Sequence, residues 1–239
     1  MAGFTRVDQF HPSTSVGDAI TNDMLEIRRA LRDSGFCSEI YSHHVAPSLE
    51  KHVRLLSDYV PESASLLIVH HSMGFDGFDE IAALACRKIL RYHNITPSHL
   101  LPNPHLQRYA EIGRRQLRDY AKHMEIGIGV SEFNRKELVQ SGYRYTSTVP
   151  LFVRGEALLS ETPDSRLQRK LAGTENLLFV GRICPNKKQE DLVRIFDKYH
   201  HSKPNARLLL PGSWEGTEEY ARHIRGVRHV ALYASLRSA

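Results

Sequence analysis

The sequence predicts an α/β protein in which helices cover both faces of a parallel sheet. Short apolar runs, typical of buried strands, alternate along the chain with longer segments that repeat apolar residues every three or four positions. Strands that alternate with helices in this way form parallel sheets, because each helix returns the chain to the same end of the sheet. The 239 residues, 41% of them hydrophobic, are enough to bury a core without a disulfide or a structural metal.

The first part of the chain, up to residue 153, carries enough elements for one complete sheet. The expected strands are short apolar runs at residues 4–10, 36–41, 66–70, 89–93, 126–130 and 148–152. The first of these runs is interrupted by the charged residues Arg6 and Asp8. The expected helices carry an apolar stripe; they are residues 20–31, 81–86, 104–123 and 132–140. Gly35 is placed to end the first helix. We therefore predict an N-terminal Rossmann-like domain over residues 1–153.

Residues 154–173 separate this domain from a second, smaller one. Apolar periodicity stops there and charged residues, serine and proline take over, so we interpret the stretch as an interdomain linker. The pattern then restarts, with strands expected at residues 177–180, 208–210 and 227–233 and helices at residues 189–200 and 217–224. Residues 174–239 are too few for a doubly wound domain, which takes well over ~100. We expect about half of a second Rossmann-like domain, from a fragment or a truncated gene, with an unpaired sheet edge and an exposed apolar face.

Composition argues against several classes of protein. The formal net charge is +5 and the pI is near 9.1, but the basic residues are dispersed, which argues against nucleic-acid binding. Cys37, Cys86 and Cys184 lie far apart and are odd in number, as expected of reduced thiols in a cytosolic protein. The residues after Met1 lack the pattern of a secretory signal, and no apolar stretch approaches the ~20 residues of a membrane span.

The run from residue 177 to residue 188 carries the strongest functional signal. Its first four residues are expected to form a buried parallel strand, and Gly181 lets the chain turn sharply at the end of it. Arg182 and Lys187 follow on the loop that leads to the next expected helix. Two cations beside a helix N-terminus can hold a diphosphate from several sides, so we predict a phosphate site here. The simpler alternative is two solvated charges at the end of a sheet.

Histidines stand at the ends of two expected strands of the first domain. His93 closes the strand at residues 89–93, on the side of a parallel sheet where ligands bind, and we favour a functional role for it. The alternative is a buried histidine that caps the sheet. His70 and His71 end another strand, and for them both interpretations stay open.

The run at residues 177–188 resembles the donor-binding signature of nucleotide-sugar glycosyltransferases with two Rossmann-like domains, the GT-B fold. Further segments extend the likeness over nearly the whole chain. Phe10–Ile20 is similar to the family's glycine-bearing acceptor loop. Ile89–Pro97 is similar to the family's strand end with an active-site histidine, and Ile128–Asn134 is similar to its strand before an S-x-x-N helix start.

The resemblance implies a retaining, hexosyltransferase-type enzyme that moves a sugar from a GDP- or UDP-sugar to a carbohydrate or lipid-linked acceptor. It places the donor on the C-terminal domain and the acceptor on the N-terminal domain, in the synthesis of cell-surface polysaccharides. Arg182 and Lys187 would offset charge on the leaving diphosphate, so no metal and no cofactor are expected. His93 would contact the transferring sugar or the acceptor, and Gly17 would let its loop approach both substrates. The implied location is the cytoplasm, with weak peripheral association at the inner face of the membrane as an open alternative.

One part of the family pattern is missing. The family carries two glutamates, eight positions apart and well downstream of the lysine, that bind the transferred sugar and the ribose. Glu215, Glu218 and Glu219 lie too early and have the wrong spacing. Two alternatives therefore stay open: a truncated, inactive remnant or acceptor-binding pseudoenzyme, and another two-domain sugar enzyme such as a nucleotide-sugar epimerase or phosphorylase.

Three other patterns have simpler explanations. Asp76 and Asp79 lack the spacing of a D-x-D metal motif, and acidic residues in loops commonly form turns. The run Gly127-Ile128-Gly129 lacks the third glycine of a dinucleotide site, which argues against hydride transfer. The arginines of residues 104–123 fit the solvated face of a helix better than a membrane surface.

Overall fold

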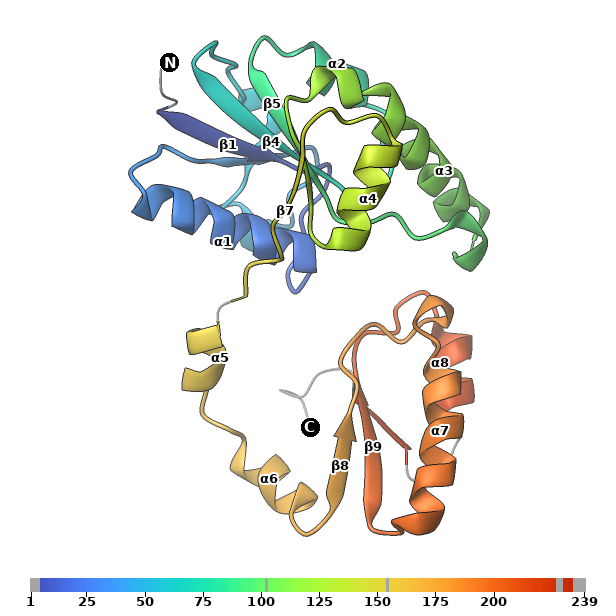
Figure 1. Cartoon of the computed structure of the whole chain (residues 1–239). Coiled ribbons are helices and arrows are strands. Elements are labelled where there is room, and N and C mark those ends of the chain that lie inside the picture. The colour runs from blue at the N-terminus through green and yellow to red at the C-terminus, as the bar shows by residue number, and fades with distance from the viewer. Residues whose placement is uncertain (1–4, 102, 154, 227–229, 234–239) are drawn as a thin grey trace. The chain divides into compact units, whose positions relative to one another are not determined.

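The computed structural model describes residues 5–101, 103–153, 155–226 and 230–233, and Figure 1 labels its elements. The chain divides into two compact units, residues 1–99 with 103–156 and the remaining residues. Each unit has its own parallel sheet and its own apolar core. None of the helices within the described ranges is both long and apolar enough to cross a membrane.

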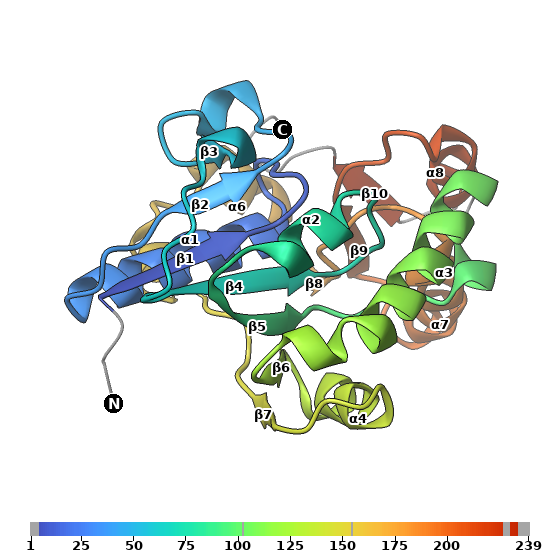
Figure 2. The same cartoon turned by 90° about the horizontal axis from the view of Figure 1, so that it is seen from above.

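The first unit is built on a seven-stranded parallel sheet, seen from above in Figure 2. Its strands run in the order β3-β2-β1-β4-β5-β6-β7, with the bounds β1 Arg6–Phe10, β2 Ile40–Ser42, β3 Arg54–Leu55, β4 Ser65–His71, β5 Arg87–Tyr92, β6 Gly127–Gly129 and β7 Thr146–Thr148. The helices are α1 Ala19–Asp33, α2 Phe78–Ala83, α3 Pro104–Asp119 and α4 Glu132–Gln140, with short 3-10 turns at Pro47–Leu49, Leu56–Asp58, Ser98–Leu100 and Ala121–His123.

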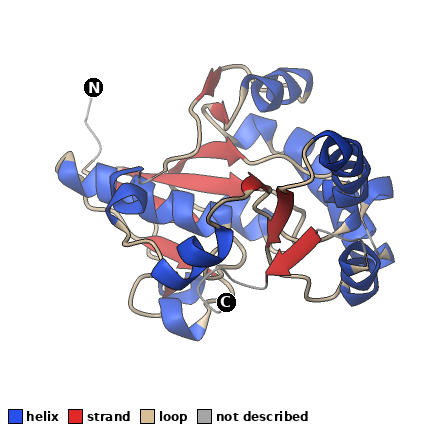
Figure 3. Ribbon diagram, turned by 90° about the horizontal axis from the view of Figure 1, so that it is seen from below, coloured by secondary structure: helices blue, strands red, loops and turns tan. Residues whose placement is uncertain are grey.

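The two faces of this sheet carry different helices, as the colouring of helices and strands in Figure 3 helps to follow. Successive residues of a strand point to opposite faces. Arg91 on β5 bonds to Asp23 of α1, whereas its neighbour Tyr92 bonds to Glu137 of α4. His71 at the end of β4 bonds to a backbone carbonyl of α3. α1 therefore covers one face, and α3 and α4 cover the other.

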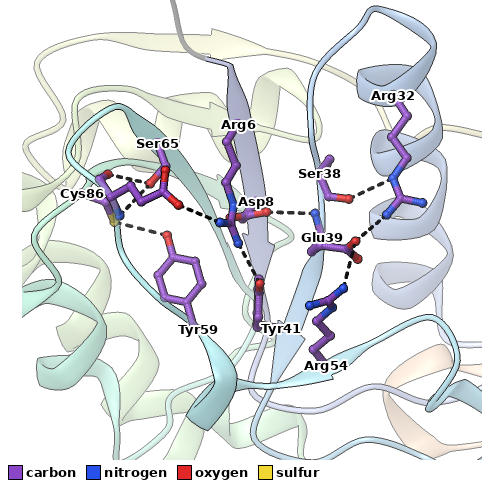
Figure 4. A network of polar contacts seen from close by, with 11 residues as sticks. Arg6, Asp8, Arg32, Ser38, Glu39, Tyr41, Arg54, Tyr59, Ser65 and Cys86 are labelled. Atoms are coloured by element: carbon purple, nitrogen blue, oxygen red, sulfur yellow. Dashed lines mark hydrogen bonds and ion pairs between the residues drawn. The ribbon is translucent and has the colours of Figure 1, made fainter.

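A polar network joins β1, β2 and α1 and explains the two charges within the first strand (Figure 4). Asp8 is fully buried, and it accepts hydrogen bonds from Arg6 Nε at 2.6 Å and from the backbone N–H of Glu39 at 2.9 Å. The Glu39 carboxylate pairs in turn with Arg32 at 2.9 Å and Arg54 at 3.5 Å. Because both oxygens of the buried Asp8 carboxylate have a partner, the strand keeps its place in the sheet.

The second unit contains a three-stranded parallel sheet in the order β10-β9-β8. Its strands are β8 Glu175–Leu178, β9 Ala206–Pro211 and β10 Val230–Tyr233. The helices after residue 154 are α5 Gly155–Ser160, α6 Ser165–Leu171, α7 Gln189–Ser202 and α8 Glu218–Arg225, with a 3-10 turn at Pro185–Lys187. The core lies between the sheet, α7 and α8, and its buried side chains include Ile183, Phe196, Leu208, Leu210 and Ile224.

The structure corrects the prediction of a buried strand at residues 177–180. The strand β8 ends at Leu178 and lies at the edge of its sheet. Leu177 and Phe179 pack against the core, but Leu178 and Val180 are 58% and 70% exposed. The run is apolar on both sides, yet only one side is covered within the described chain.

Several other boundaries differ from those expected. The strand expected at residues 148–152 is β7, which ends at Thr148, because residues 149–152 bond to side chains of α1 and β5 instead. The expected linker contains the short helices α5 and α6. Residues 227–229 of the last expected strand, and residue 4 of the first, lie outside the described residues.

Candidate functional site

The strand order of the first sheet reverses between β1 and β4. These strands are adjacent in the sheet, although β2 and β3 lie between them in the sequence. Ligands of open parallel sheets bind at such a switch point, outside the carboxyl ends of the strands. His11 directly follows β1, Ser72 directly follows β4, and His93 directly follows β5. We define these ends as the switch-point edge of the first unit.

A buried ion pair anchors the switch-point edge. Arg91 donates to both carboxylate oxygens of Asp23 at 2.6 and 3.0 Å, and the two side chains are only 3% and 0% exposed. Arg91 also donates to the carbonyl oxygens of Val149 and Pro150, and Asp23 accepts the backbone N–H of Phe152 at 2.9 Å. Buried charges are tolerated when they are paired and further hydrogen-bonded in this way. The pair therefore fixes residues 149–152 against α1 and β5.

A chain of hydrogen bonds runs from His93 into the interior. Gln9 Nε2 donates to the carbonyl oxygen of Met24 at 2.9 Å, so Gln9 Oε1 accepts the Nε2–H of His70 at 3.0 Å. The other nitrogen of His70, Nδ1, is then the acceptor of the 2.8 Å hydrogen bond from His93 Nε2. The His93 side chain is 4% exposed, and its Nε2 proton is already committed to His70.

Burial keeps the histidines of this edge neutral. Burial, and to a lesser degree the charge of Arg91, lower the pKa of His93 to about 3. Burial lowers the pKa of His71 to about 4, and it lowers the pKa of His70 well below its ordinary value and that of His11 to a smaller extent. Desolvation disfavours the charged imidazolium, so the switch-point edge carries no net charge from its histidines near neutral pH.

The loop that follows β1 covers His11. His11 Nδ1 lies 2.5 Å from the carbonyl oxygen of Ser13, and His11 Nε2 lies 3.2 Å from Ser72 Oγ. Gly17 has a φ of +79°, a left-handed conformation that favours glycine, with no atom within 4 Å of the place a Cβ would take. Asp18 then caps α1 by accepting the N–H of Thr21 at 2.9 Å. Within the described chain, Gly17 is thus required by the turn and not by close packing.

The residues Asp23, His70 and His93 place three potential metal-binding atoms within 4.8 Å of one another. Such a set suits a divalent ion by residue type. However, Arg91 Nε lies 2.6 Å from the same Asp23 oxygen that faces His93, so a second cation there would meet a full positive charge. His70 Nδ1 already accepts a hydrogen bond from His93. We interpret the group as an ion pair with a hydrogen-bonded histidine chain, not as a metal centre.

In the second unit, the loop between β8 and α7 carries the two predicted phosphate ligands. Arg182 and Lys187 are both exposed, and neither forms a salt bridge with another residue that the structure describes, whereas Lys188 lies 3.7 Å from Glu190. Burial raises the pKa of the Cys184 thiol, and the nearby charges of Arg182 and Lys187 offset part of this rise. The two cations therefore flank one buried thiol on the loop between β8 and α7.

A contact between two loops holds Arg182 in place. Arg182 Nη2 donates to the carbonyl oxygen of Glu215 at 2.8 Å, and the Arg182 carbonyl accepts Gln189 Nε2 at 2.8 Å. A Cβ at Gly212 would lie only 1.8 Å from the carbonyl oxygen of Gly181. Glycine is therefore required at position 212 for the loops after β8 and β9 to touch.

A cavity of about 330 Å³ adjoins this loop contact, lined by Ser213, Trp214, Glu215 and Glu218. The Arg225 guanidinium lies 5.0 Å above the centre of the Trp214 ring. Hydroxyl and carboxylate groups beside an aromatic ring can accept the hydroxyl groups of a sugar and pack against its apolar face. The cavity therefore offers a surface for an uncharged, hydroxyl-rich group next to Arg182.

The structure thus places the predicted site residues in two groups. His93 and Gly17 lie at the switch-point edge, and Arg182 and Lys187 share one loop of the second unit. Sequence reasoning missed Asp23 and Arg91, because a pattern of neighbouring residues does not show that two charges 68 positions apart pair in the core. It also passed over His11, although the strand end Phe10-His11-Pro12 was a usable signal.

Comparisons with known proteins locate the chain by its structure. No family model and no curated protein matches the sequence. A glycosyltransferase from Rickettsia africae is similar with a TM-score of 0.67 at 12% identity, over 97% of this chain and 68% of that one. HepE from Anabaena, solved with UDP and glucose, has a TM-score of 0.64 at 16% identity, over 95% of this chain and 68% of HepE.

The putative UDP-N-acetylglucosamine 2-epimerase from Listeria monocytogenes is also similar, with a TM-score of 0.56 at 13% identity, over 99% of this chain and 70% of that one. Likeness at such low identity shows the fold alone. The predicted fold class is confirmed: a complete Rossmann-like domain with a parallel sheet, followed by part of a second one, as in the GT-B fold.

Proposed function

We propose that this chain acts in glycosyl transfer from a nucleotide-diphosphate sugar, with the donor bound by the second unit and the acceptor by the first. The observation that carries the proposal is the pair of exposed cations, Arg182 and Lys187, on the loop that begins α7. Neither forms a salt bridge with another described residue, although the charge of Arg182 helps to lower the pKa of Glu218, so both remain available to an anion. HepE, a protein of similar fold, was solved with UDP and glucose.

The two cations suit the step in which the sugar leaves the nucleotide. Negative charge grows on the diphosphate as its bond to the sugar breaks, and fixed positive groups stabilise that charge without reorganising. Arg182 is oriented by its bond to Glu215 O, while Lys187 is free to approach a second phosphate. The cavity around Trp214 would take the uncharged part of the donor, either the ribose or the transferred sugar.

Further features of the proposal follow from the resemblance at residues 177–188. They are retention of configuration at the anomeric carbon, transfer of a hexose, and a carbohydrate or lipid-linked acceptor. The setting would be cell-surface polysaccharide synthesis in the cytoplasm, without a metal or an organic cofactor. His93 would act near the acceptor, through the hydrogen-bonded chain that orients its ring.

A thermal melt with UDP, GDP or ADP tests the donor site directly. A ligand at ~100 times its Kd adds roughly 2.7 kcal/mol to the stability of the state that binds it. We expect one nucleotide to raise the Tm of the second unit. This Tm is measured from the fluorescence of Trp214, the only tryptophan in the sequence. Lys187→Ala should abolish the shift, whereas Lys198→Ala, at an exposed lysine further along α7, should retain it.

Transfer activity tests the role of Lys187 in the reaction. Lys187→Ala should lower the turnover by ~10²-fold or more, because one fixed charge at the leaving group is worth a few kcal/mol. If the turnover fell by less than about threefold, Lys187 would not contact the diphosphate in the complex that reacts. His93→Ala should reduce transfer more than nucleotide binding.

The alternatives differ in their products. An inactive remnant or acceptor-binding pseudoenzyme would bind a carbohydrate without transferring a sugar to it. A nucleotide-sugar epimerase would alter or release the sugar without any acceptor, and the similarity to the Listeria protein makes this control necessary.

A further inference from the structure

A cleft beside α1 gathers arginines to which the proposed glycosyl transfer gives no role. The cleft has a volume of about 420 Å³, and the side chains along it include Leu25, Arg28, Arg29, Arg32 and His52. Ligand pockets commonly measure about 300–1,000 Å³, so a small molecule fits here. All of these residues belong to the first unit, on α1 and on the loop before β3.

Three guanidinium groups share one carboxylate beside this cleft. Arg32 Nη2 lies 2.9 Å from Glu39 Oε1, and Figure 4 shows Arg54 approaching the same carboxylate. Arg54 Nη2 is 3.5 Å from Glu39 Oε1, and Arg28 Nη1 is 4.0 Å from Glu39 Oε2. One negative charge does not neutralise three positive ones, so this group of side chains keeps an excess of positive charge.

Arg28 is the least compensated of the three arginines. Its side chain is only 11% exposed, and it donates a hydrogen bond to the backbone carbonyl of His52. Arg28 and Arg32 stand four positions apart on α1, where like charges destabilise a helix. Burial and the charge of Arg32 lower the pKa of Arg28, and Glu39 opposes only part of this change. An additional anion would therefore stabilise both guanidinium groups.

The acidic residues of the cleft indicate where an anion would bind. Arg29 already pairs with Glu26 at 2.5 Å, and Asp33 is the last residue of α1. Both carboxylates repel an anion, so we place the anion at Arg28 and Arg32 and not at Arg29. Carboxylates also accept hydrogen bonds from hydroxyl groups. The cleft thus offers donors for an anionic group and acceptors for hydroxyl groups attached to it.

We propose that the cleft beside α1 binds a phosphate monoester through Arg28 and Arg32. A phosphate monoester carries about two negative charges at pH 7, which matches the excess of three guanidinium groups over one carboxylate. Guanidinium groups bind phosphate oxygens through paired N–H donors. The site is independent of the donor loop, which lies in the second unit. A soluble phosphate ester and the head group of a lipid share this chemistry, and the experiment separates the two sources.

Hydrogen exchange of the whole chain, measured by mass spectrometry, distinguishes this site from the donor loop. Glycerol 3-phosphate should slow the exchange of the amides of residues 25–34. Arg32→Gln should weaken this response by ~10-fold or more in concentration, because it removes a charged partner of the phosphate. The matched control is Arg115→Gln, which changes an exposed arginine on α3 and should respond as the wild-type chain does.

Glu39→Gln is a second variant, with the opposite expected effect. It removes the carboxylate that competes with phosphate for the arginines and keeps the shape of the side chain. Its affinity for glycerol 3-phosphate should therefore rise by about threefold or more, since an ion pair of partly exposed groups is worth up to about 1 kcal/mol. An affinity of Glu39→Gln that is equal to or weaker than that of the wild-type chain would contradict the proposed balance of charge.

Vesicles of phosphatidylcholine with phosphatidic acid present the same phosphate monoester on a lipid surface. Binding to these vesicles without a response to glycerol 3-phosphate, and lost in Arg32→Gln, would assign the site to a lipid head group. The proposal is overturned if neither probe acts on residues 25–34, or if Arg32→Gln and Arg115→Gln respond alike. The arginines would then only balance the helix dipole at the end of α1. A response confined to residues 182–200 would likewise overturn it, because the phosphate would then occupy only the donor loop.

Discussion

Mild acid should unfold the first unit well before the second. Folding lowers the pKa of His71 from 6.5 to about 4 and that of His93 from 6.5 to about 3. Between pH 6.5 and these values the unfolded chain binds more protons than the folded chain, so the free energy of unfolding falls as the pH falls. His70 and His11, whose pKa values burial also lowers, act in the same direction.

The size of the effect follows from the differences in pKa. At pH 5 an imidazole with a folded pKa of about 4 is mostly neutral in the folded chain and almost fully protonated in the unfolded chain. This difference costs roughly 2 kcal/mol relative to pH 7.5, and His93 adds about the same. A loss of ~4 kcal/mol is a large share of the about 5–15 kcal/mol that stabilises a typical domain. Asp8, whose pKa burial raises, opposes the loss at lower pH.

The assay is urea unfolding at pH 7.5, 6.0 and 5.0, with a separate probe for each unit. Hydrogen exchange of the β4 amides, measured by mass spectrometry, reports the first unit. The emission of Trp214 reports the second unit, whose described histidines, His200, His201 and His223, are all at least partly exposed. The transition of β4 should move to lower urea concentration with acid much more than that of Trp214.

A variant connects the pH dependence to one residue. His71→Phe keeps a ring between Phe78 and Tyr92 and removes one titrating group, together with a buried Nδ1 atom that has no hydrogen-bond partner. The slope of the unfolding free energy against pH should then decrease between pH 5 and pH 6.5, by about the amount that the uptake of one proton on unfolding produces. The reasoning is refuted if the stability of the first unit stays constant, or rises, between pH 7.5 and pH 5 in the wild-type chain.

Two further predictions concern packing. Arg91→Met should destabilise the first unit by about 3–5 kcal/mol in urea unfolding, because it leaves a buried carboxylate unpaired. The control, Arg194→Met, removes an exposed pair and should change the urea midpoint little. Equal effects of the two substitutions would mean that the buried pair is not the anchor. Gly212→Ala should lower nucleotide affinity in a titration, because its Cβ would displace Gly181, and Gly155→Ala, with open space around it, is the control. Unchanged affinity in Gly212→Ala would show that the loop contact does not shape the donor site.

The sequence was sufficient for most of the longer elements, but not for β3, α5 and α6 or for the partners of its buried charges. The apolar stripe of residues 20–31 and the boundaries of α4 follow from local periodicity, and the structure reproduces them. Asp23 and Arg91 are 68 positions apart, so only the folded sheet reveals that they compensate each other. The prediction for residues 177–180 was wrong for a related reason, since an apolar run does not show whether a partner covers both of its sides.

The same structural device, a loop at the carboxyl end of a parallel strand, produces opposite electrostatics in the two units. At the switch-point edge every strong charge is paired or neutral: Arg91 is matched by Asp23, and burial holds the imidazoles uncharged. On the loop before α7, Arg182 and Lys187 are exposed and form no salt bridge among the described residues, although Arg182 acts at longer range on Glu218. An uncharged surface loses no ion hydration when it binds a neutral polyol, while free cations are attracted to a diphosphate. This division of charge supports an acceptor on the first unit and a nucleotide sugar on the second, and exchanging the charges, as in Lys187→Glu, should abolish nucleotide binding without affecting the fold of either sheet.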